Sequence, residues 1–156
     1  MFNFSNFWLS HAPIFSILIP AFTSFLLLIL GNPGSGSLKQ DWRQPWRRSI
    51  SLGSVTLGLI TAVSYLLLAS TGQITVYQLS EWSAPFGIVL VLDRLSAFML
   101  VLTYGLALPV LWYASDNWDT RGRYFHAMFH FLLMGLSGAF LTGDLFNLFV
   151  FFEILL

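Results

Sequence analysis

The chain contains no cysteine and few charged residues, although it is 156 residues long. Without cysteine it can form no disulfide, no thiolate metal site and no cysteine nucleophile. Asp, Glu, Lys and Arg make up 9% of the residues, against about 25% in a soluble domain. The formal net charge is zero, which excludes the basic field that nucleic-acid binding needs. Residues 1–38 contain no Lys or Arg, so the first apolar segment reads as a retained anchor rather than a signal peptide.

What is present instead is apolar sequence, since 56% of the residues are hydrophobic and 17% are aromatic. A helix needs about 20 apolar residues to cross the hydrocarbon core of a bilayer. We therefore expect an all-α polytopic membrane protein with four complete transmembrane helices and a truncated fifth. The expected helices cover residues 12–30, 49–70, 95–115, 124–143 and 145–156.

The last of these segments is too short to cross the bilayer. A chain end there would leave a terminal carboxylate and unpaired carbonyls inside the hydrocarbon, where backbone groups must be satisfied internally. We therefore expect residues 1–156 to be the N-terminal part of a longer membrane domain. The alternative is a short interfacial tail over residues 145–156.

The basic residues alternate between the loops. All but Arg94 of the seven lie in the first and third loops: Lys39, Arg43, Arg47, Arg48, Arg121 and Arg123. The positive-inside rule places these loops in the cytoplasm and the N-terminus outside. The second loop alternates at period two over residues 73–78 and has a β-branched run over residues 87–92, with residues 80–85 as the connection. This pattern predicts a β-hairpin on the outer face, between the second and third helices.

Glu153 is the one acid in the apolar run from Leu145 to Leu156. If the fifth helix begins near Gly143, Glu153 lies about 15 Å along it, near the middle of a core of about 30 Å. A carboxylate at that depth costs roughly 2.5 kcal/mol or more, and such groups usually mark an ion or proton path. The alternative is a protonated glutamate that is hydrogen-bonded between helices.

Three further ionisable residues are weaker candidates for the path. Asp144 is well placed to cap the fifth helix, or it could stand at the outer mouth of an ion path. His126 and His130 lie at i and i+4 on one face of the fourth helix, a spacing that could hold zinc, but no third ligand is evident. A hydrated proton route and hydrogen bonding between helices are the remaining alternatives. We expect no metal site and no cofactor.

Two other patterns concern packing. Asp93 could cap the third helix, and Arg94 could pair with an acid or reach lipid headgroups. Small residues four apart, Ser54 with Gly58 and Gly135 with Ala139, predict close helix packing.

Two stretches of the sequence resemble a known family. Residues 138–156, GAFLTGDLFNLFVFFEILL, resemble the proton-antiporter membrane subunits, which include the antiporter-like subunits of respiratory complex I. The closer resemblance is to the D subunits of the multisubunit Mrp-type antiporters. Residues 82–97, WSAPFGIVLVLDRLSA, resemble the outer hairpin and third-helix entry of those subunits. The resemblance covers residues 12–156 and is strongest from residue 82 onward.

The resemblance implies a transporter subunit rather than an enzyme. It implies exchange of Na⁺ or K⁺ for protons, in a hetero-oligomeric complex in the bacterial cell membrane. Glu153 matches the fifth-helix glutamate that works with a lysine on the seventh helix, which this chain does not contain. The chain alone is therefore expected to be inactive. The alternatives are a proton-pumping subunit of complex I or of a membrane-bound hydrogenase, and an assembly scaffold that transports nothing.

Overall fold

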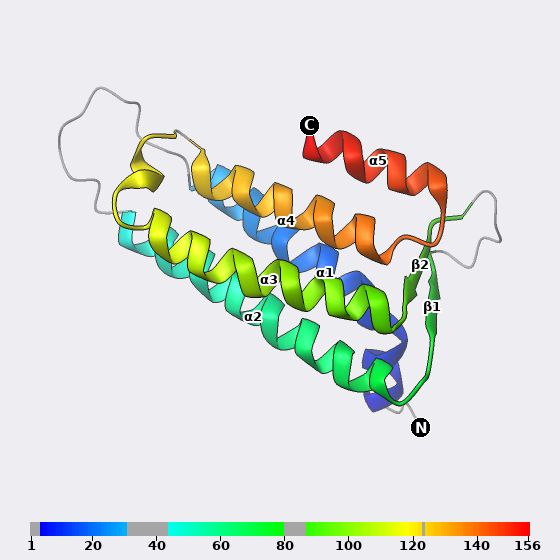
Figure 1. Ribbon diagram of the computed structural model, residues 1–156. Helices are drawn as coiled ribbons and strands as arrows, with labels where there is room; N and C mark the ends of the chain where they lie inside the picture. Colours follow the sequence, from blue (N-terminus) through cyan, green and yellow to red (C-terminus); the bar gives the residue numbers. More distant parts are fainter. Residues whose placement is uncertain (1–3, 31–43, 80–86, 123) are drawn as a thin grey trace.

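Five helices lie side by side, and a two-stranded sheet closes one end of the bundle (Figure 1). The computed structural model describes residues 4–30, 44–79, 87–122 and 124–156, with side chains from residue 11 onward. Within these ranges the elements are α1 (Phe4–Ile29), α2 (Gln44–Ser70), β1 (Thr75–Gln78), β2 (Val89–Leu92), α3 (Arg94–Ala114), the 3₁₀ turn η2 (Trp118–Thr120), α4 (Phe125–Leu141) and α5 (Leu145–Leu155).

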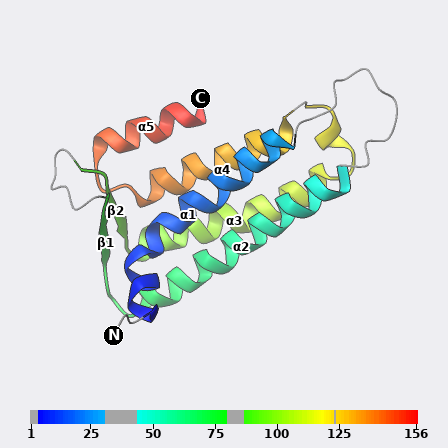
Figure 2. The ribbon, with the colours of Figure 1, turned by 180° about the vertical axis from the view of Figure 1, so that it is seen from behind.

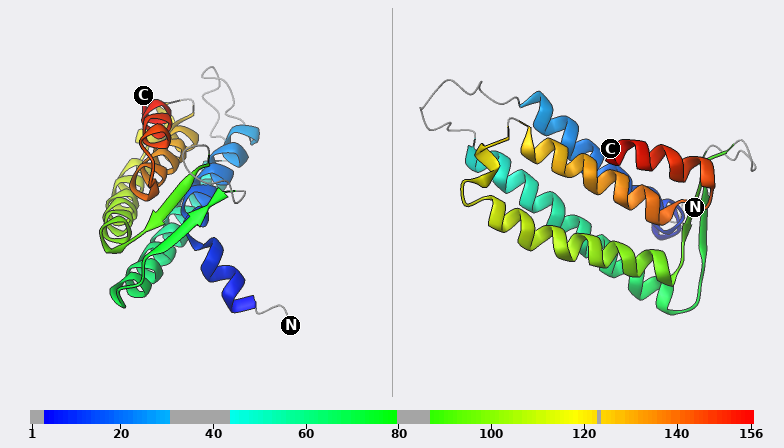
Figure 3. Two further views of the ribbon diagram at one scale, coloured as in Figure 1. Left: turned by 90° about the vertical axis from the view of Figure 1, so that its right-hand side faces the viewer. Right: turned by 45° about the horizontal axis from the view of Figure 1, so that its top comes forward.

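The helices pack in one pair that is distant in the sequence and in pairs of consecutive helices. α1 lies along α4, as Figure 2 shows, and α2 lies along α3. α5 packs on α4 at the edge of the bundle (Figure 3). Each of the five predicted helices is present within the described ranges, although several begin or end at other residues than expected.

α1 begins well before the predicted position and contains two prolines. It starts at Phe4 rather than residue 12, so Pro13 and Pro20 lie inside the helix. Each proline lacks the N–H that would bond one turn back, and its ring crowds the preceding turn, so prolines bend helices. The first turns of α1 indeed lie at an angle to the rest (Figure 3).

Within the described residues, three helices are long and apolar enough to cross a membrane: His11–Ile29, Gln44–Ser70 and Arg94–Ala114. α4 and α5 are apolar but shorter. The expected count of four complete spans is therefore not confirmed. α4 ends at Leu141 rather than residue 143 because Thr142 takes an extended conformation and pairs with Leu90 at the edge of the sheet.

The predicted β-hairpin is present in the described residues, and the predicted connection over 80–85 lies outside them. β1 and β2 pair antiparallel, with Thr75 opposite Leu92. The link between α4 and α5 extends this sheet, because the Gly143 N–H donates to the Val89 carbonyl at 2.8 Å. A Cβ at Gly143 would lie 2.7 Å from Val91 Cγ2. The backbone of the link thus packs directly on the hairpin, and α5 begins there.

The predicted small-residue pairs mark real close contacts, with one change of residue. A Cβ at Gly58 would lie 2.3 Å from the ring of Tyr104 on α3. On α4, Gly135 faces Leu155, and Gly138 rather than Ala139 lies against the ring of Phe151. Glycine therefore lets α3 approach α2, and lets α5 approach α4.

The start of α3 is fixed by Asp93 and Arg94. Asp93 caps the helix as predicted, since its carboxylate accepts from the Ser96 N–H while the Ser96 hydroxyl accepts from the Asp93 N–H. The bond from the Ser96 N–H is the main cause that holds the pKa of Asp93 below its usual value. Arg94 donates to the carbonyls of Ala69 at 3.1 Å and Ser70 at 3.0 Å. Its observed partners are the last carbonyls of α2 and, in the described ranges, no acid; contact with lipid headgroups stays a prediction.

Candidate functional site

Five buried or half-buried polar side chains meet at the end of the bundle opposite the hairpin, where η2 lies (Figure 1). We call them the polar cluster: Arg48 and Ser51 from α2, Asp119 from η2, and His126 and His130 from α4. Each is hydrogen-bonded to at least one other member or to its backbone. The cluster therefore joins α2 to η2 and α4, which lie far from it in the sequence.

Asp119 and Arg48 form a two-pronged ion pair. Arg48 Nε donates to Asp119 Oδ2 at 2.7 Å, and Arg48 Nη2 donates to Oδ1 at 2.8 Å. The Asp119 side chain is 0% exposed and that of Arg48 is 28% exposed. Burial by itself would raise the pKa of Asp119, but the hydrogen bonds from Arg48 and His126 outweigh it and hold the pKa below its usual value. Asp119 is thus a buried carboxylate that stays ionised.

His126 bridges Asp119 and Ser51. Its Nε2 lies 3.1 Å from Asp119 Oδ2, and its Nδ1 lies 3.1 Å from Ser51 Oγ. An ionised carboxylate can only accept hydrogen bonds, so Nε2 carries the proton. In the neutral ring, Nδ1 then accepts from the Ser51 hydroxyl.

His130 is the innermost member and is fully buried. Its Nδ1 lies 2.9 Å from the carbonyl oxygen of His126 and 3.4 Å from Ser51 Oγ. A carbonyl only accepts, so Nδ1 carries the proton and Nε2 holds the lone pair. Within the described part of the chain, that Nε2 has no hydrogen-bond partner.

His126 and His130 thus lie on one face of α4, as predicted, and both rings contact the Ser51 hydroxyl. Both ring nitrogens of His126 are engaged by Ser51 and Asp119. Among the described residues, no group of three His, Cys, Asp or Glu side chains is placed to hold a metal ion. The sequence interpretation missed Ser51 and Asp119. The sequence offered one signal for these partners. Asp119 lies in a loop seven residues before His126, and the other basic loop contains arginines.

Asp144 caps α5, as the sequence predicts. Its carboxylate accepts from the Phe146 N–H and from Asn147 Nδ2, each at 2.8 Å. A further role for Asp144 at the mouth of an ion path stays a prediction.

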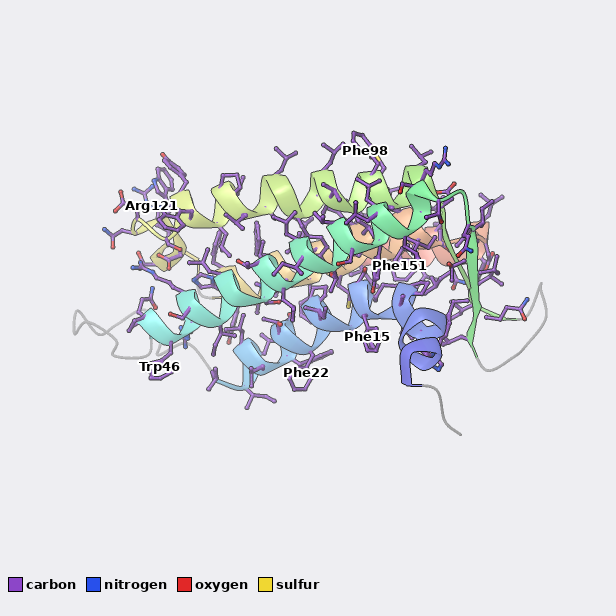
Figure 4. All side chains as sticks on the ribbon, turned by 90° about the horizontal axis from the view of Figure 1, so that it is seen from below. Phe15, Phe22, Trp46, Phe98, Arg121 and Phe151 are labelled. Atoms are coloured by element: carbon purple, nitrogen blue, oxygen red, sulfur yellow. The ribbon has the colours of Figure 1, made fainter. Side chains whose placement is uncertain are left out.

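Glu153 lies on the outer face of α5 and is exposed. Phe151 and Leu155 face the glycines of α4, and Glu153 is two residues from each. Two residues turn a helix by about 200°, so Glu153 points away from α4. In the described ranges it forms no ion pair. Figure 4, seen from below, labels the neighbouring Phe151 on α5, behind the other helices.

The polar cluster and Glu153 are therefore separate. The cluster faces α2 on the inner side of α4, whereas α5 packs where Gly135 and Gly138 open the surface of α4. The structure brings His126 and His130 together, and it does not bring either of them to Glu153 or Asp144. The proton-handling role of all four stays a prediction.

No family model matches the chain. It is 46% identical over 154 residues to a probable K(+)/H(+) antiporter D subunit of Rhizobium meliloti (strain 1021), an alignment that covers 96% of this chain and 27% of that protein. It is 36% identical over 151 residues to a Na(+)/H(+) antiporter D subunit of Alkalihalophilus pseudofirmus, covering 95% of this chain and 28% of that protein. The chain thus spans little more than a quarter of the length of these relatives.

Solved structures share the fold. The chain superposes on a chain of the Mrp complex from Dietzia sp. DQ12-45-1b with a TM-score of 0.82 and 28% identity, covering 94% of this chain and 26% of that one. A chain of the membrane-bound sulfane sulfur reductase, an archaeal respiratory membrane complex, gives a TM-score of 0.74 at 22% identity, covering 94% of this chain and 28% of that one. The second likeness concerns the fold alone.

Proposed function

We propose that this chain, a homologue of the N-terminal portion of antiporter D subunits, supplies part of the membrane domain of a monovalent cation/proton antiporter. The complete protein would exchange cytoplasmic Na⁺ or K⁺ for external protons, together with the other subunits of a membrane complex. The observation that carries this proposal is the 46% identity to a D subunit over 96% of the chain. The likeness to a chain of an Mrp complex supports it.

The proposed topology follows from the basic residues. Arg48 and Arg121 lie near the polar cluster, at the end opposite the hairpin. The positive-inside rule then places the cluster at the cytoplasmic face of the bacterial cell membrane, with the hairpin and the N-terminus outside. α4 and the segment over residues 145–156 would also lie within the bilayer, as parts of one membrane domain over residues 1–156.

Glu153 is the residue that we propose takes up and releases the transported proton. It points away from α4 into a direction that the described helices leave open. Further helices of a longer chain could pack there and bring it a basic partner. A carboxyl group within the bilayer is costly unless it faces protein or water. The outward position of Glu153 therefore favours a role that requires further helices packed against it.

The test is Glu153→Gln in vesicles that contain the complete antiporter. We expect proton-gradient-coupled cation exchange to fall to background while the complex still assembles, because glutamine keeps the size of the side chain but cannot ionise. Asp116→Asn, which neutralises an exposed acid at the loop end, should leave exchange intact. Residues 1–156 expressed alone should show none. Full exchange by Glu153→Gln would remove Glu153 from the path.

A proton pump of the complex I or hydrogenase class is the second candidate, because a respiratory membrane complex shares the fold. The energy source distinguishes an antiporter from a redox-driven proton pump. Cation exchange that needs a proton gradient and no redox substrate supports antiport, and exchange that requires electron transfer supports the pump. A scaffold without transport predicts neither.

A further inference from the structure

We propose that the polar cluster is a proton-release relay, which carries protons from His130 in the bundle interior to Asp119 at the loop end. The relay deepens the proposed antiport function, on which its direction rests. Antiport of this kind brings protons inward, and the proposed topology puts Asp119 on the cytoplasmic side. His130, Ser51, His126 and Asp119 would be the last proton carriers before the cytoplasm.

The hydrogen bonds among the four proposed proton carriers, which exclude Arg48, all point the same way. His130 Nδ1–H faces Ser51 Oγ at 3.4 Å, a long contact that it shares with the His126 carbonyl. The Ser51 hydroxyl donates to His126 Nδ1, and His126 Nε2–H donates to Asp119 Oδ2, each at 3.1 Å. Every donor therefore faces the loop end, and the chain begins at an acceptor, His130 Nε2.

The transfer conserves every proton. A hydrated proton that reaches His130 binds at Nε2, and the ring releases its Nδ1 proton to Ser51 Oγ. Ser51 gives up its own hydroxyl proton to His126 Nδ1, and His126 releases its Nε2 proton to Asp119 Oδ2. One proton enters at His130 Nε2 and one proton ends on Asp119 Oδ2. Rotation of the hydroxyl and return of each ring to its starting tautomer, His130 to Nδ1–H and His126 to Nε2–H, restore the starting state with no net gain of protons.

Asp119 is suited to the release step. Arg48 holds its carboxylate in the ionised form through two short bonds, and the pKa of Asp119 lies below its usual value. A carboxyl group of this kind gives up a proton readily at neutral pH. Arg48, which is 28% exposed, forms the outer end of the cluster.

The surroundings of the histidines contain few other charges. In the described ranges the charged groups near them are Arg47 and Arg48 on α2 and Asp119 on η2. From α1, the Ser24 hydroxyl donates to the Ala127 carbonyl at 2.8 Å and Phe25 lies against Phe131, so neither contact brings a charge. On α3, Tyr104 meets Ser137 two turns further along α4, which is about 10 Å at 1.5 Å per residue. Asp119 is thus the acid placed to receive the proton.

A purely structural role is the competing explanation, since the same bonds also join α2, η2 and α4. A substitution at Ser51 distinguishes the relay from a structural role. The Ser51 hydroxyl carries the proton between the histidines, whereas the ion pair of Arg48 and Asp119 does not involve it. Removal of that hydroxyl should therefore interrupt transfer and leave the ion pair in place.

The experiment compares Ser51→Ala with Ser54→Ala in vesicles that contain the complete antiporter. Ser54 lies nearly one turn further along α2, and its hydroxyl accepts from Thr23 at 2.8 Å, outside the cluster. At equal amounts of assembled complex, we expect Ser51→Ala to lower the exchange rate by roughly tenfold or more, in the range of a lost proton-transfer group. Ser51→Thr should restore much of the rate because it keeps the hydroxyl. Equal rates for the two alanine variants would overturn the relay.

A second measurement does not depend on transport. Nitrogen NMR of labelled histidine in the complex, in lipid, should show His130 protonated at Nδ1 and His126 at Nε2, and Ser51→Ala should shift both signals. His130 protonated at Nε2 would overturn the relay even if exchange is intact. If the wild-type complex exchanges no cations, the proposed function fails. The tautomers then decide whether the hydrogen-bond chain itself exists.

Discussion

Asp119 accepts hydrogen bonds from three side-chain nitrogens, two of Arg48 and one of His126. A buried carboxylate is costly without such partners, so the fold at the loop end depends on all of them together. η2 places Asp119 next to the N-terminal turns of α2 and α4. Asn117, which directly precedes η2, has a φ of 73°. Asparagine tolerates this left-handed conformation better than most residues.

Asp119→Asn tests this dependence through pH. The pKa of Asp119 in the folded protein lies below its usual value. The ion pair therefore adds stability above about pH 4, the ordinary range of an aspartate, and loses it as the pH falls through the lower folded pKa. We expect the variant to be less stable at pH 7 by about 1–3 kcal/mol, and the gap to close in acid. Thermal unfolding from pH 7 to pH 3 measures both. A gap that is independent of pH would contradict the assignment, and Asp116→Asn serves as the control.

The sequence could identify the residue types of the site but not its partners. The spacing of His126 and His130 places both on one face of a helix, and helical periodicity makes that contact predictable. The contacts of Ser51 with these rings join residues 75 and 79 positions apart. Such long-range pairs leave no periodic signal in one chain. Arg94 shows the same limit, because only the fold brings it to the carbonyls of Ala69 and Ser70.

At the scale of the helices, glycine decides how closely α2 and α3 approach. Tyr104 is almost fully buried, and its ring fills the space beside Gly58. Its hydroxyl donates to the Ser16 carbonyl at 3.0 Å and meets Ser137 Oγ at 3.2 Å. One tyrosine therefore connects α3 with α1 and α4, and it can do so because α2 has no side chain at position 58.

Gly58→Ala should disturb this arrangement. The new methyl group would lie 2.3 Å from the Tyr104 ring, and a ring held by two hydrogen bonds can move little. We expect a loss of about 1–3 kcal/mol, as for overpacked cores, seen as a lower thermal midpoint. Gly53→Ala is the matched control on the same helix, because nothing lies within 4 Å of its Cβ position. There alanine should be neutral or stabilising by roughly 0.5–1 kcal/mol. The same loss in both variants would contradict the packing argument.

Helix type was predictable throughout, whereas helix ends were less so. α2 begins at Gln44 rather than residue 49, because a proline in the first turn, Pro45, is compatible with a helix start and the arginines that follow continue the helix. α4 stops early because Thr142, the residue that follows it, pairs with Leu90 of the sheet. Hydropathy marks the apolar part of a helix, and these ends were set by polar residues and by tertiary pairing.

At the scale of the whole molecule, the two ends of the bundle differ in character. The hairpin and the start of α5 occupy one end, and the polar cluster with η2 occupies the other (Figures 1 and 2). Because the described residues Arg47, Arg48 and Arg121 lie at the cluster end, the proposed topology makes a definite statement about which end faces the cytoplasm.

Single cysteines test this topology, and the natural absence of cysteine removes background labelling of the chain. Gln78→Cys on the hairpin and Arg121→Cys beside η2 are both exposed positions. In intact cells, we expect a membrane-impermeant thiol reagent to label Gln78→Cys and to label Arg121→Cys after lysis alone. The reverse pattern would invert the proposed orientation and, with it, the direction of the relay.

The contacts of Arg94 also bear on how the chain enters the membrane. A guanidinium that must cross the bilayer during insertion is a burden on translocation. In the proposed topology Arg94 ends on the outer side, where it meets the carbonyls at the end of α2 and the helix dipole favours positive charge. The folded protein thus gives the Arg94 guanidinium hydrogen-bond acceptors within the protein, independent of lipid composition. Arg94 can therefore help to hold the second and third helices as an inserted pair before later segments arrive.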